Sequence, residues 1–150
     1  MNIDFFMSEA ILEANKAFIN NEVPVGGLIV DNKTKSILAR GYNKINKSNN
    51  SINHCEISLI NSACKKLKSK YLINTTLFIS LEPCIMCSAA ISEIHISKVY
   101  FGAYNINNEG LEKFIIRYNK KNFFIPEVYG GFYEKESLEL LKKFFKDKRK

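Results

Sequence analysis

LFISLEPCIMC, residues 77–87, is the stretch of sequence that decides the fold of this chain. Its apolar start, residues 77–79, predicts a buried strand, and Pro83 predicts the first turn of a helix that follows directly. On that turn Cys84 and Cys87 are three residues apart, so their thiols point to the same side. The positive end of the helix favours thiolates, the form that binds metal. A metal site between a strand and a helix fits an α/β layered sheet.

A second segment, His54-Cys55-Glu56, supplies the partners of this cysteine pair. One imidazole and two thiolates leave the fourth position of tetrahedral zinc open, as in catalytic sites, whereas structural zinc sites usually take four protein ligands. Such a zinc ion lowers the pKa of bound water from about 15.7 toward about 7. Glu56 can take that proton and deliver it to a ring nitrogen and to departing ammonia. The residues predict a catalytic zinc site that activates water, with His54, Cys84 and Cys87 as ligands and Glu56 as the proton carrier.

Helices and strands are expected to alternate along the rest of the chain. Apolar residues with helical spacing predict amphipathic helices, and short apolar runs beside turn residues predict buried strands. These patterns predict a helix near residues 7–18, a hairpin with strands at 28–30 and 37–39, a surface loop at 43–53, a helix after residue 54, a strand at 98–101 that Gly102 ends, and a terminal helix from residue 137. No internal repeat or domain boundary is visible, so residues 1–150 are expected to form a single domain.

Composition bears on the location and the partners of the protein. No stretch approaches the roughly 20 apolar residues of a membrane helix, and the N-terminus lacks a basic signal-peptide region, so we expect a cytoplasmic protein with no membrane partner. There the four cysteines stay reduced, which favours metal binding over disulfides. Lysine and arginine outnumber aspartate and glutamate by 22 to 15, a net charge of +7. This excess favours a polyanionic partner, but a coding bias toward Asn, Ile and Lys explains it equally well.

The two motifs together resemble a known signature. His54-x-Glu56 followed by Pro83-Cys84-x-x-Cys87 is similar to the signature of the zinc-dependent nucleobase deaminases. Further segments resemble the bacterial tRNA-specific adenosine deaminases in the same order along the chain, namely residues 22–26, 41–43, 81–87, 101–103 and 144–145. The match spans nearly the whole sequence.

The resemblance implies the architecture and the reaction of that family. The fold would be a three-layer α/β/α, cytidine deaminase-like fold with a central mixed five-stranded sheet, assembled as a homodimer with one Zn2+ per subunit. The enzyme would hydrolyse the wobble adenosine of an arginine tRNA to inosine, taking the base from the anticodon stem-loop into the zinc pocket, with Glu56 as the catalytic residue. The substrate-binding positions of this sequence would be Asn43, Cys55, Pro83, Asn105, Phe145 and Arg149.

Some of these contacts have simpler alternatives. The Asn43 amide can donate to a ring nitrogen and accept from an amino group, but asparagine here can also simply form a turn. Phe144 and Phe145 point about 100° apart on a helix, so only one is expected to meet RNA, and packing on the core is the alternative for each. The basic residues at the C-terminus are accompanied by one acidic residue, Asp147. They either bind phosphates or form a solvated tail. They are Lys142, Lys143, Lys146, Lys148, Arg149 and Lys150.

Three positions depart from the family. Cys55 stands where alanine is usual, and its side chain is expected to be buried and turned away from zinc. Residues 93–95 read Glu-Ile-His where the family has His-Ser-Arg, and His95 is not expected to be catalytic. Asn105 replaces an aspartate, which removes a negative charge near a phosphate backbone and an acceptor for a ribose 2′-hydroxyl. We therefore expect this enzyme to discriminate less against single-stranded DNA than its relatives do.

Two other functions stay open on the sequence. A deaminase of free guanine, cytosine or a nucleotide shares the zinc signature and differs mainly in the pocket and the end of the chain. The basic C-terminus argues against that function. A non-catalytic, RNA-binding subunit of a heterodimer shares the same fold, but the presence of Glu56 argues against it.

Overall fold

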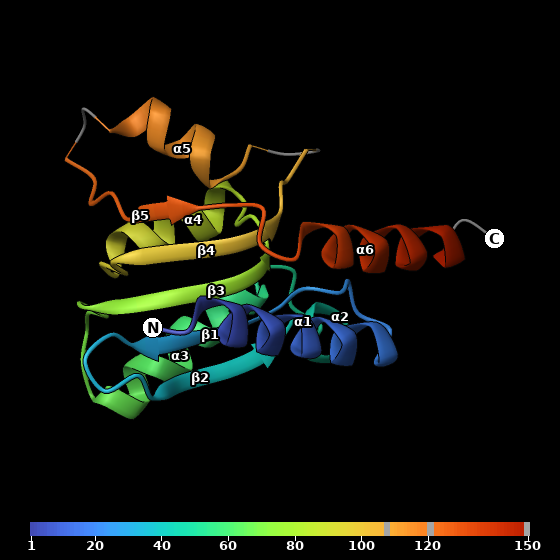
Figure 1. Ribbon diagram of the computed structural model, residues 1–150, viewed down its shortest axis with the longest axis horizontal. Helices are drawn as coiled ribbons and strands as arrows, with labels where there is room; N and C mark the ends of the chain where they lie inside the picture. Colours follow the sequence, from blue (N-terminus) through green and yellow to red (C-terminus); the bar gives the residue numbers. More distant parts are fainter. Residues whose placement is uncertain (107–108, 120–121, 149–150) are drawn as a thin grey trace.

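The computed structural model describes residues 1–106, 109–119 and 122–148, which form one sheet covered by helices (Figure 1). Five strands follow the order β2-β1-β3-β4-β5 across this sheet. Along the chain the elements are α1 (Ile3–Ile19), β1 (Gly26–Asp31), β2 (Ile37–Tyr42), α2 (Ile45–Ser48), α3 (Cys55–Leu67), β3 (Thr75–Leu81), α4 (Ile85–Glu93), β4 (Lys98–Ala103), α5 (Leu111–Tyr118), β5 (Glu127–Tyr129) and α6 (Glu134–Lys148). None of these helices is long and apolar enough to cross a membrane.

The sheet is mixed. β1 runs antiparallel to both of its neighbours, β2 and β3, whereas β3, β4 and β5 run parallel to one another. The predicted hairpin is the β1–β2 pair, in which Ile29 lies opposite Ala39. The central strand β3 is buried along its whole length except at Leu81, because helices cover both faces of the sheet.

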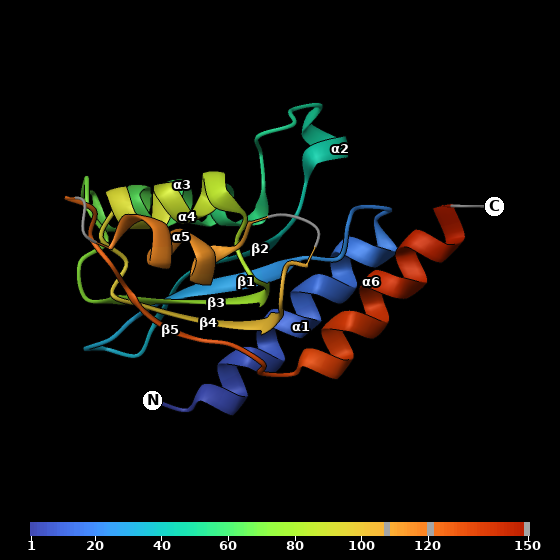
Figure 2. The ribbon, with the colours of Figure 1, turned by 90° about the horizontal axis from the view of Figure 1, so that it is seen from above.

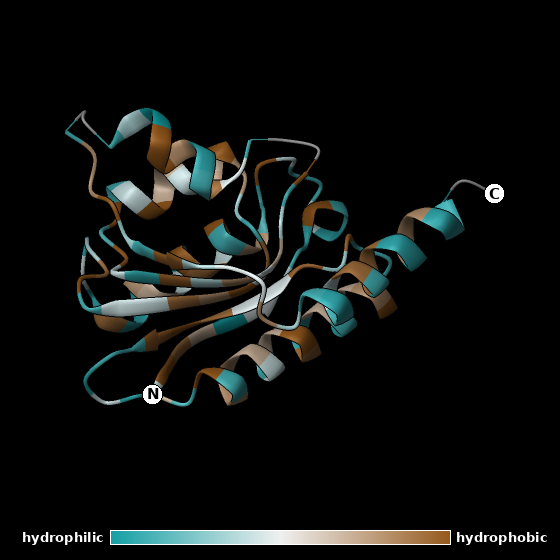
Figure 3. Ribbon diagram, turned by 45° about the horizontal axis from the view of Figure 1, so that its top comes forward, coloured by the Kyte–Doolittle hydropathy of each residue, from teal (hydrophilic) through white to brown (hydrophobic). Residues whose placement is uncertain are grey.

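Two helical layers enclose the sheet. Figure 2 shows α1 and α6 on one face and α3, α4 and α5 on the other. Because side chains alternate along a strand, Leu28 and Val30 pack with Phe6 of α1, and Ile29 packs with Leu59 of α3. Figure 3 shows the hydrophobic strands enclosed by helices that carry hydrophilic residues on their outer sides. This arrangement confirms the predicted three-layer α/β/α fold with a mixed five-stranded sheet.

The start of α4 differs from the prediction by two residues. The helix begins at Ile85 with Cys84 as its N-cap, so Pro83 lies ahead of the cap rather than in the first turn. A proline just before the cap restricts the chain entering the helix without removing a helical hydrogen bond. The end of β4 was also wrong, because the strand continues through Gly102 to Ala103.

The last third of the chain holds elements that the sequence did not reveal. Helix α5 and strand β5 both precede the only helix predicted there, and that helix, α6, begins at Glu134 rather than at Ser137. The predicted surface loop at 43–53 contains the short helix α2, in which no residue is buried. Of these segments, α6 and the first residue of α2, Ile45, line the cavity described next.

Candidate active site

His54 and Cys84 occupy equivalent places, at the N-caps of α3 and α4. An N-cap side chain often accepts a hydrogen bond from a backbone N–H of the first turn, but neither of these side chains does so. Both are therefore free to point into the space between the two helix starts. Glu56 and Cys87 lie in the first turns of the same two helices. Two positive helix ends thus converge on this cluster and favour negative charge there.

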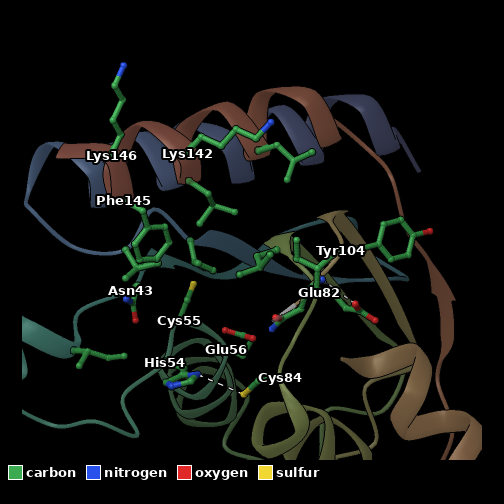
Figure 4. Close-up of a pocket in the computed structure, with 18 residues that line it drawn as sticks. Asn43, His54, Cys55, Glu56, Glu82, Cys84, Tyr104, Lys142, Phe145 and Lys146 are labelled. Carbon is green, nitrogen blue, oxygen red and sulfur yellow. Dashed lines mark hydrogen bonds between the residues drawn. The ribbon is translucent and has the colours of Figure 1, made fainter. Parts of the chain in front are cut away.

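The three predicted ligands fit a zinc ion. The Nδ1 atom of His54 lies 3.6 Å from the Sγ atom of Cys84 and 3.6 Å from that of Cys87. All three ligand atoms lie within 4.8 Å of one another. Tetrahedral zinc, with Zn–S and Zn–N bonds of about 2.3 and 2.0 Å, requires a nitrogen–sulfur separation of about 3.5 Å. Figure 4 shows His54 and Cys84 facing each other beneath the cavity.

The two thiols are not equally acidic. A hydrogen bond from the Cys87 thiol lowers the pKa of Cys84 to about 5, assisted by backbone N–H groups and by the nearby His54, although burial opposes the shift. The same hydrogen bond, together with burial, raises the pKa of Cys87. Without metal, Cys84 is therefore the thiolate, and Cys87 gives up its proton on metal binding.

Glu56 is buried beside this cluster, with 5% of its surface exposed. Burial raises the pKa of its carboxyl group from 4.5 to about 7, and the negative charge on Cys84 acts in the same direction. Hydrogen bonds from its own backbone N–H and from the Cys87 thiol oppose the shift. A carboxyl group that titrates near neutral pH can both accept and release a proton, which suits general acid–base catalysis.

Replacing Glu56 by glutamine is expected to stabilise the zinc-free protein at pH 8 but much less at pH 4. The folded-state pKa of about 7 lies above the unfolded value of 4.5. Folding therefore favours the protonated form, and the stability that this form contributes is lost as the pH rises through about 7. Glutamine stays neutral at both pH values. From pH 4 to pH 8 the free energy of unfolding of the variant should therefore rise by about 3 kcal/mol relative to that of wild type. Urea unfolding of both proteins at pH 4 and pH 8 measures their free energies of unfolding. A difference between variant and wild type that is the same at both pH values contradicts the raised pKa.

The cluster forms the floor of a cavity of about 840 Å³. His54, Glu56 and Cys84 line its floor, and helix α6 lines the opposite side. The lining residues of α6 are Leu138, Leu141, Lys142, Phe145 and Lys146. Figure 4 shows Phe145 above Asn43, with Lys146 directed away from the cluster. The cavity therefore combines a reactive floor with an apolar and basic rim.

Most predicted substrate contacts lie around this cavity. The lining includes Asn43, Cys55, Asn105 and Phe145. Pro83 does not line it: the residue is buried, and its carbonyl oxygen accepts a hydrogen bond from the Ser88 hydroxyl at 3.3 Å. Its place ahead of the α4 cap keeps Pro83 in the protein interior, and its contact with substrate stays a prediction. Arg149 lies outside the described residues.

Asn43 and Cys55 line the cavity in different ways. Asn43 is buried, and its backbone N–H donates to the carbonyl of Val25 at 2.9 Å, while its side-chain amide makes no hydrogen bond to another described residue. The amide is therefore available to a ligand. The Cys55 thiol donates to the Gly41 carbonyl at 3.4 Å, and Figure 4 shows its sulfur directed away from the metal cluster. Burial raises the pKa of this thiol, so it stays neutral.

The two phenylalanines of α6 point in different directions, as their spacing predicts. Phe144 is buried against Phe18 of α1, with ring centroids 6.4 Å apart. Phe145 is 44% exposed and lines the cavity. Phe145 is thus the residue of the pair that a ligand can reach.

The basic residues of α6 are divided between two sides of the helix. Lys142 and Lys146 line the cavity. Lys143 instead lies over a phenylalanine ring of α1 at 5.4 Å, and Lys148 donates to the side chain of Asn21 at 2.6 Å. The two basic residues that follow Lys148 lie outside the described part of the chain. Of the four predicted phosphate-binding lysines in that part, two line the cavity.

Sequence reasoning missed two buried carboxylates near the cavity, Glu22 and Glu82. The Glu82 carboxylate accepts backbone N–H groups of Asn105 at 3.0 Å and of Glu112 at 2.9 Å. Gly110 packs against it so closely that an added Cβ would lie 2.2 Å from the Glu82 carboxyl carbon. Glu82 thereby fixes the cavity wall that follows β4. Each glutamate precedes a proline by one or two residues and lies in a segment that resembles the family, but neither signal shows what its carboxylate binds.

His95 lies apart from the cavity, at the far end of α4 from Cys84. Its ring packs between Tyr71 and Phe124, with centroids 5.1 and 4.8 Å away. This placement agrees with the expectation that His95 is not catalytic.

Comparison with known proteins identifies related sequences. Residues 1–103 match the family model of the cytidine and deoxycytidylate deaminase zinc-binding region. This segment contains the three candidate ligands and Glu56. The chain is also 39% identical to the tRNA-specific adenosine deaminase of Rickettsia bellii (strain RML369-C) over 141 residues, which cover 93% of this chain and 97% of the relative.

Solved structures agree with these matches. One comes from a study of A-to-I editing by tRNA:A34 deaminases at the wobble position of transfer RNA; its TM-score is 0.84 at 35% identity, covering 91% of this chain and 99% of that chain. Guanine deaminase from Bacillus subtilis gives a TM-score of 0.63 at 33% identity, covering 69% of this chain and 66% of that chain. The first similarity extends over much more of both chains than the second.

Proposed function

This chain belongs to the cytidine and deoxycytidylate deaminase family of zinc-binding proteins and, within it, to the tRNA-specific adenosine deaminases. From that membership we propose that it hydrolyses the wobble adenosine in the anticodon of an arginine tRNA to inosine and releases ammonia. The observation that carries this proposal is the continuity of one cavity from the His-Cys-Cys cluster to the basic and aromatic side of α6. Its volume of about 840 Å³ exceeds what a single base needs and leaves room for neighbouring nucleotides.

His54, Cys84 and Cys87 hold one zinc ion per chain, and Glu56 moves the protons. When bound, zinc supplies the nucleophile by lowering the pKa of water toward about 7. Glu56 accepts one proton from the attacking water and passes it to a ring nitrogen of the base. It then takes the second proton from the new hydroxyl group and gives it to the departing amine, so that adenosine and water become inosine and ammonia. Its raised pKa, about 7 in the zinc-free protein, suits a group that must both take and give a proton.

The rest of the cavity binds the RNA. The adenine is splayed out of the anticodon loop, as enzymes that act on bases require, and meets the free Asn43 amide. Phe145 offers an exposed ring on which a neighbouring base stacks. Lys142 and Lys146 neutralise phosphates near the rim, so binding weakens as salt concentration rises. A tRNA substrate places the reaction in the cytoplasm.

The active form is a homodimer, as the resemblance to the tRNA-specific adenosine deaminases implies. Sedimentation of the zinc-loaded protein is expected to give a dimer at micromolar concentration. A monomer that is fully active contradicts this assignment.

A comparison of substrates tests the proposed function. Zinc-loaded protein is incubated with an arginine anticodon stem-loop, with the same stem-loop carrying guanosine at the wobble position, and with free guanine, cytosine and adenosine. Inosine in the first RNA alone is the expected result. Ammonia from a free base alone would leave the zinc chemistry in place and favour the alternative, a free-base deaminase like the guanine deaminase of Bacillus subtilis.

Replacing Asn105 by aspartate is expected to increase the preference for RNA over DNA. The residue lines the cavity and its backbone is fixed by Glu82, so the added carboxylate would face the nucleic acid and accept from a ribose 2′-hydroxyl, which DNA lacks. We expect the ratio of RNA to DNA hairpin deamination to rise about tenfold, the effect of one charged contact. The same ratio in both proteins, or no DNA deamination by wild type, contradicts the role of Asn105.

A further inference from the structure

The wall of the cavity that carries Asn43 has almost no apolar packing of its own. Asn43 leads directly into α2, a helix of four residues, none of them buried. Its N-cap, Lys44, makes no side-chain hydrogen bond to the first turn. Figure 2 shows α2 standing clear of the two helical layers. A segment with so few buried contacts needs polar interactions to stay ordered.

Glu22 supplies those interactions from the turn between α1 and β1. One oxygen of its carboxylate accepts the backbone N–H of Asn46 at 2.9 Å, and the other accepts that of Lys47 at 2.8 Å. Glu22 is only 2% exposed, and it makes no ion pair within the described part of the chain. Burial of an unpaired carboxylate is costly, so these two charge-assisted hydrogen bonds are strong local constraints.

Glu22 also ties this wall to the sheet that holds Asn43. Its own backbone N–H donates to Ala17 at the end of α1, at 2.9 Å. Three residues later, the Val25 carbonyl accepts the backbone N–H of Asn43, also at 2.9 Å. Asn43 is thereby held on one side by Val25 and on the other by a helix that Glu22 anchors. Ile45, the first residue of that helix, lines the cavity beside it.

We propose that Glu22 is a positioning residue for deamination: its buried carboxylate anchors α2 and so fixes Asn43 and Ile45 against the substrate. The inference rests on the proposed function only in assigning Asn43 to the substrate. Glu82 anchors the opposite wall in the same way, with two backbone N–H groups. Both walls of the cavity are thus anchored by buried glutamates that accept backbone N–H groups.

A double-mutant cycle of Glu22→Gln and Asn43→Ala tests the proposal. Glutamine keeps the shape of Glu22 but turns an NH2 group toward one of the two backbone donors, so we expect kcat/KM to fall about tenfold, mainly through KM. If Glu22 acts through Asn43, the same substitution should cost much less in the Asn43→Ala background. Full additivity of the two effects would overturn the proposal, as would an unchanged KM in the single variant.

Hydrogen exchange provides a second readout that needs no substrate. In Glu22→Gln the amides of Asn46 and Lys47 should exchange at least about tenfold faster, while those of β1 and β3 keep their protection. Unchanged exchange at both amides contradicts the anchor. The cycle is measured on whichever substrate yields ammonia with wild type, so failure of the tRNA assignment stays distinct from failure of the anchor. Glu22→Asp, which keeps the charge with a shorter reach, replaces Glu22→Gln if that variant does not fold.

Asp31→Asn is the matched control. The Asp31 carboxylate also accepts two backbone N–H groups, those of Lys33 at 2.8 Å and Thr34 at 3.1 Å, but in the hairpin turn at the other end of β1. We expect KM and kcat to stay within about twofold of wild type in this variant, as for surface substitutions away from a site. A KM increase equal to that of Glu22→Gln would show a general loss of stability instead and would overturn the proposal.

Discussion

In the Glu56→Ala variant, product formation should fall by at least about 10³-fold, while zinc content and affinity for RNA stay unchanged. Proton transfer by a positioned side chain contributes about 10²–10⁴-fold to the rate, and Glu56 serves more than one transfer. The carboxylate is not one of the three candidate ligands, so the metal cluster stays complete. Its loss leaves no other carboxylate in the first turns of α3 and α4. Inosine formed per zinc-bound chain is the quantity to measure, beside RNA affinity.

Controls separate this effect from changes in structure. Glu56→Gln removes the titration but keeps the size, and it should be nearly as inactive as the alanine variant. Glu93→Ala removes an exposed carboxylate at the opposite end of α4 and should stay fully active. If the Glu56→Ala variant retains more than about a tenth of wild-type activity, the role of Glu56 is refuted. A loss of less than about tenfold is smaller than the contribution of general acid–base catalysis.

Cys87→Ala should lose both zinc and activity. Cys87 is fully buried, and its sulfur lies 3.6 Å from the Nδ1 atom of His54, so its removal leaves two of the three protein ligands. Even residues that only support metal ligands cost about 10–100-fold in metal affinity, so we expect a loss of at least about 100-fold here. Because zinc binds only the folded site, the melting temperature should also stop rising with added zinc.

Cys64→Ala is the control for this prediction. Cys64 lies on the same helix as Glu56 but is half-buried and outside the His-Cys-Cys cluster. It should bind one zinc ion per chain and retain full activity. Equal zinc loss in the two cysteine variants, or an unchanged zinc affinity in Cys87→Ala, would show that the cluster is not the metal site.

The sequence predicted the elements whose burial follows a simple period. The runs at 28–30, 37–39 and 77–79 lie in strands β1, β2 and β3, and the helical patterns near 7–18 and after 54 are α1 and α3. The cysteine spacing and the His-x-Glu motif predicted a cluster that the structure brings together across 30 residues of chain. Local patterns were sufficient there because each ligand sits at the start of a regular helix.

The sequence failed where long-range contacts decide the structure. β5 has three residues and only Val128 among them is even partly buried, so no local pattern marks it as a strand. Glu22 and Glu82 each bind backbone groups more than 20 residues away, and no side-chain motif encodes a backbone N–H. The start of α4 was placed two residues early, at Pro83, because sequence patterns locate helix ends only to within one or two residues.

The most direct test of zinc-dependent deamination of tRNA follows oxygen from water into the RNA. Zinc-loaded protein is incubated with the arginine anticodon stem-loop in water enriched in the heavy oxygen isotope, and the nucleosides are analysed by mass spectrometry. Hydrolysis predicts one heavy oxygen in inosine at the wobble position, one ammonia per inosine, and neither product with Glu56→Ala. Wobble adenosine that remains intact while zinc is fully bound would contradict the account.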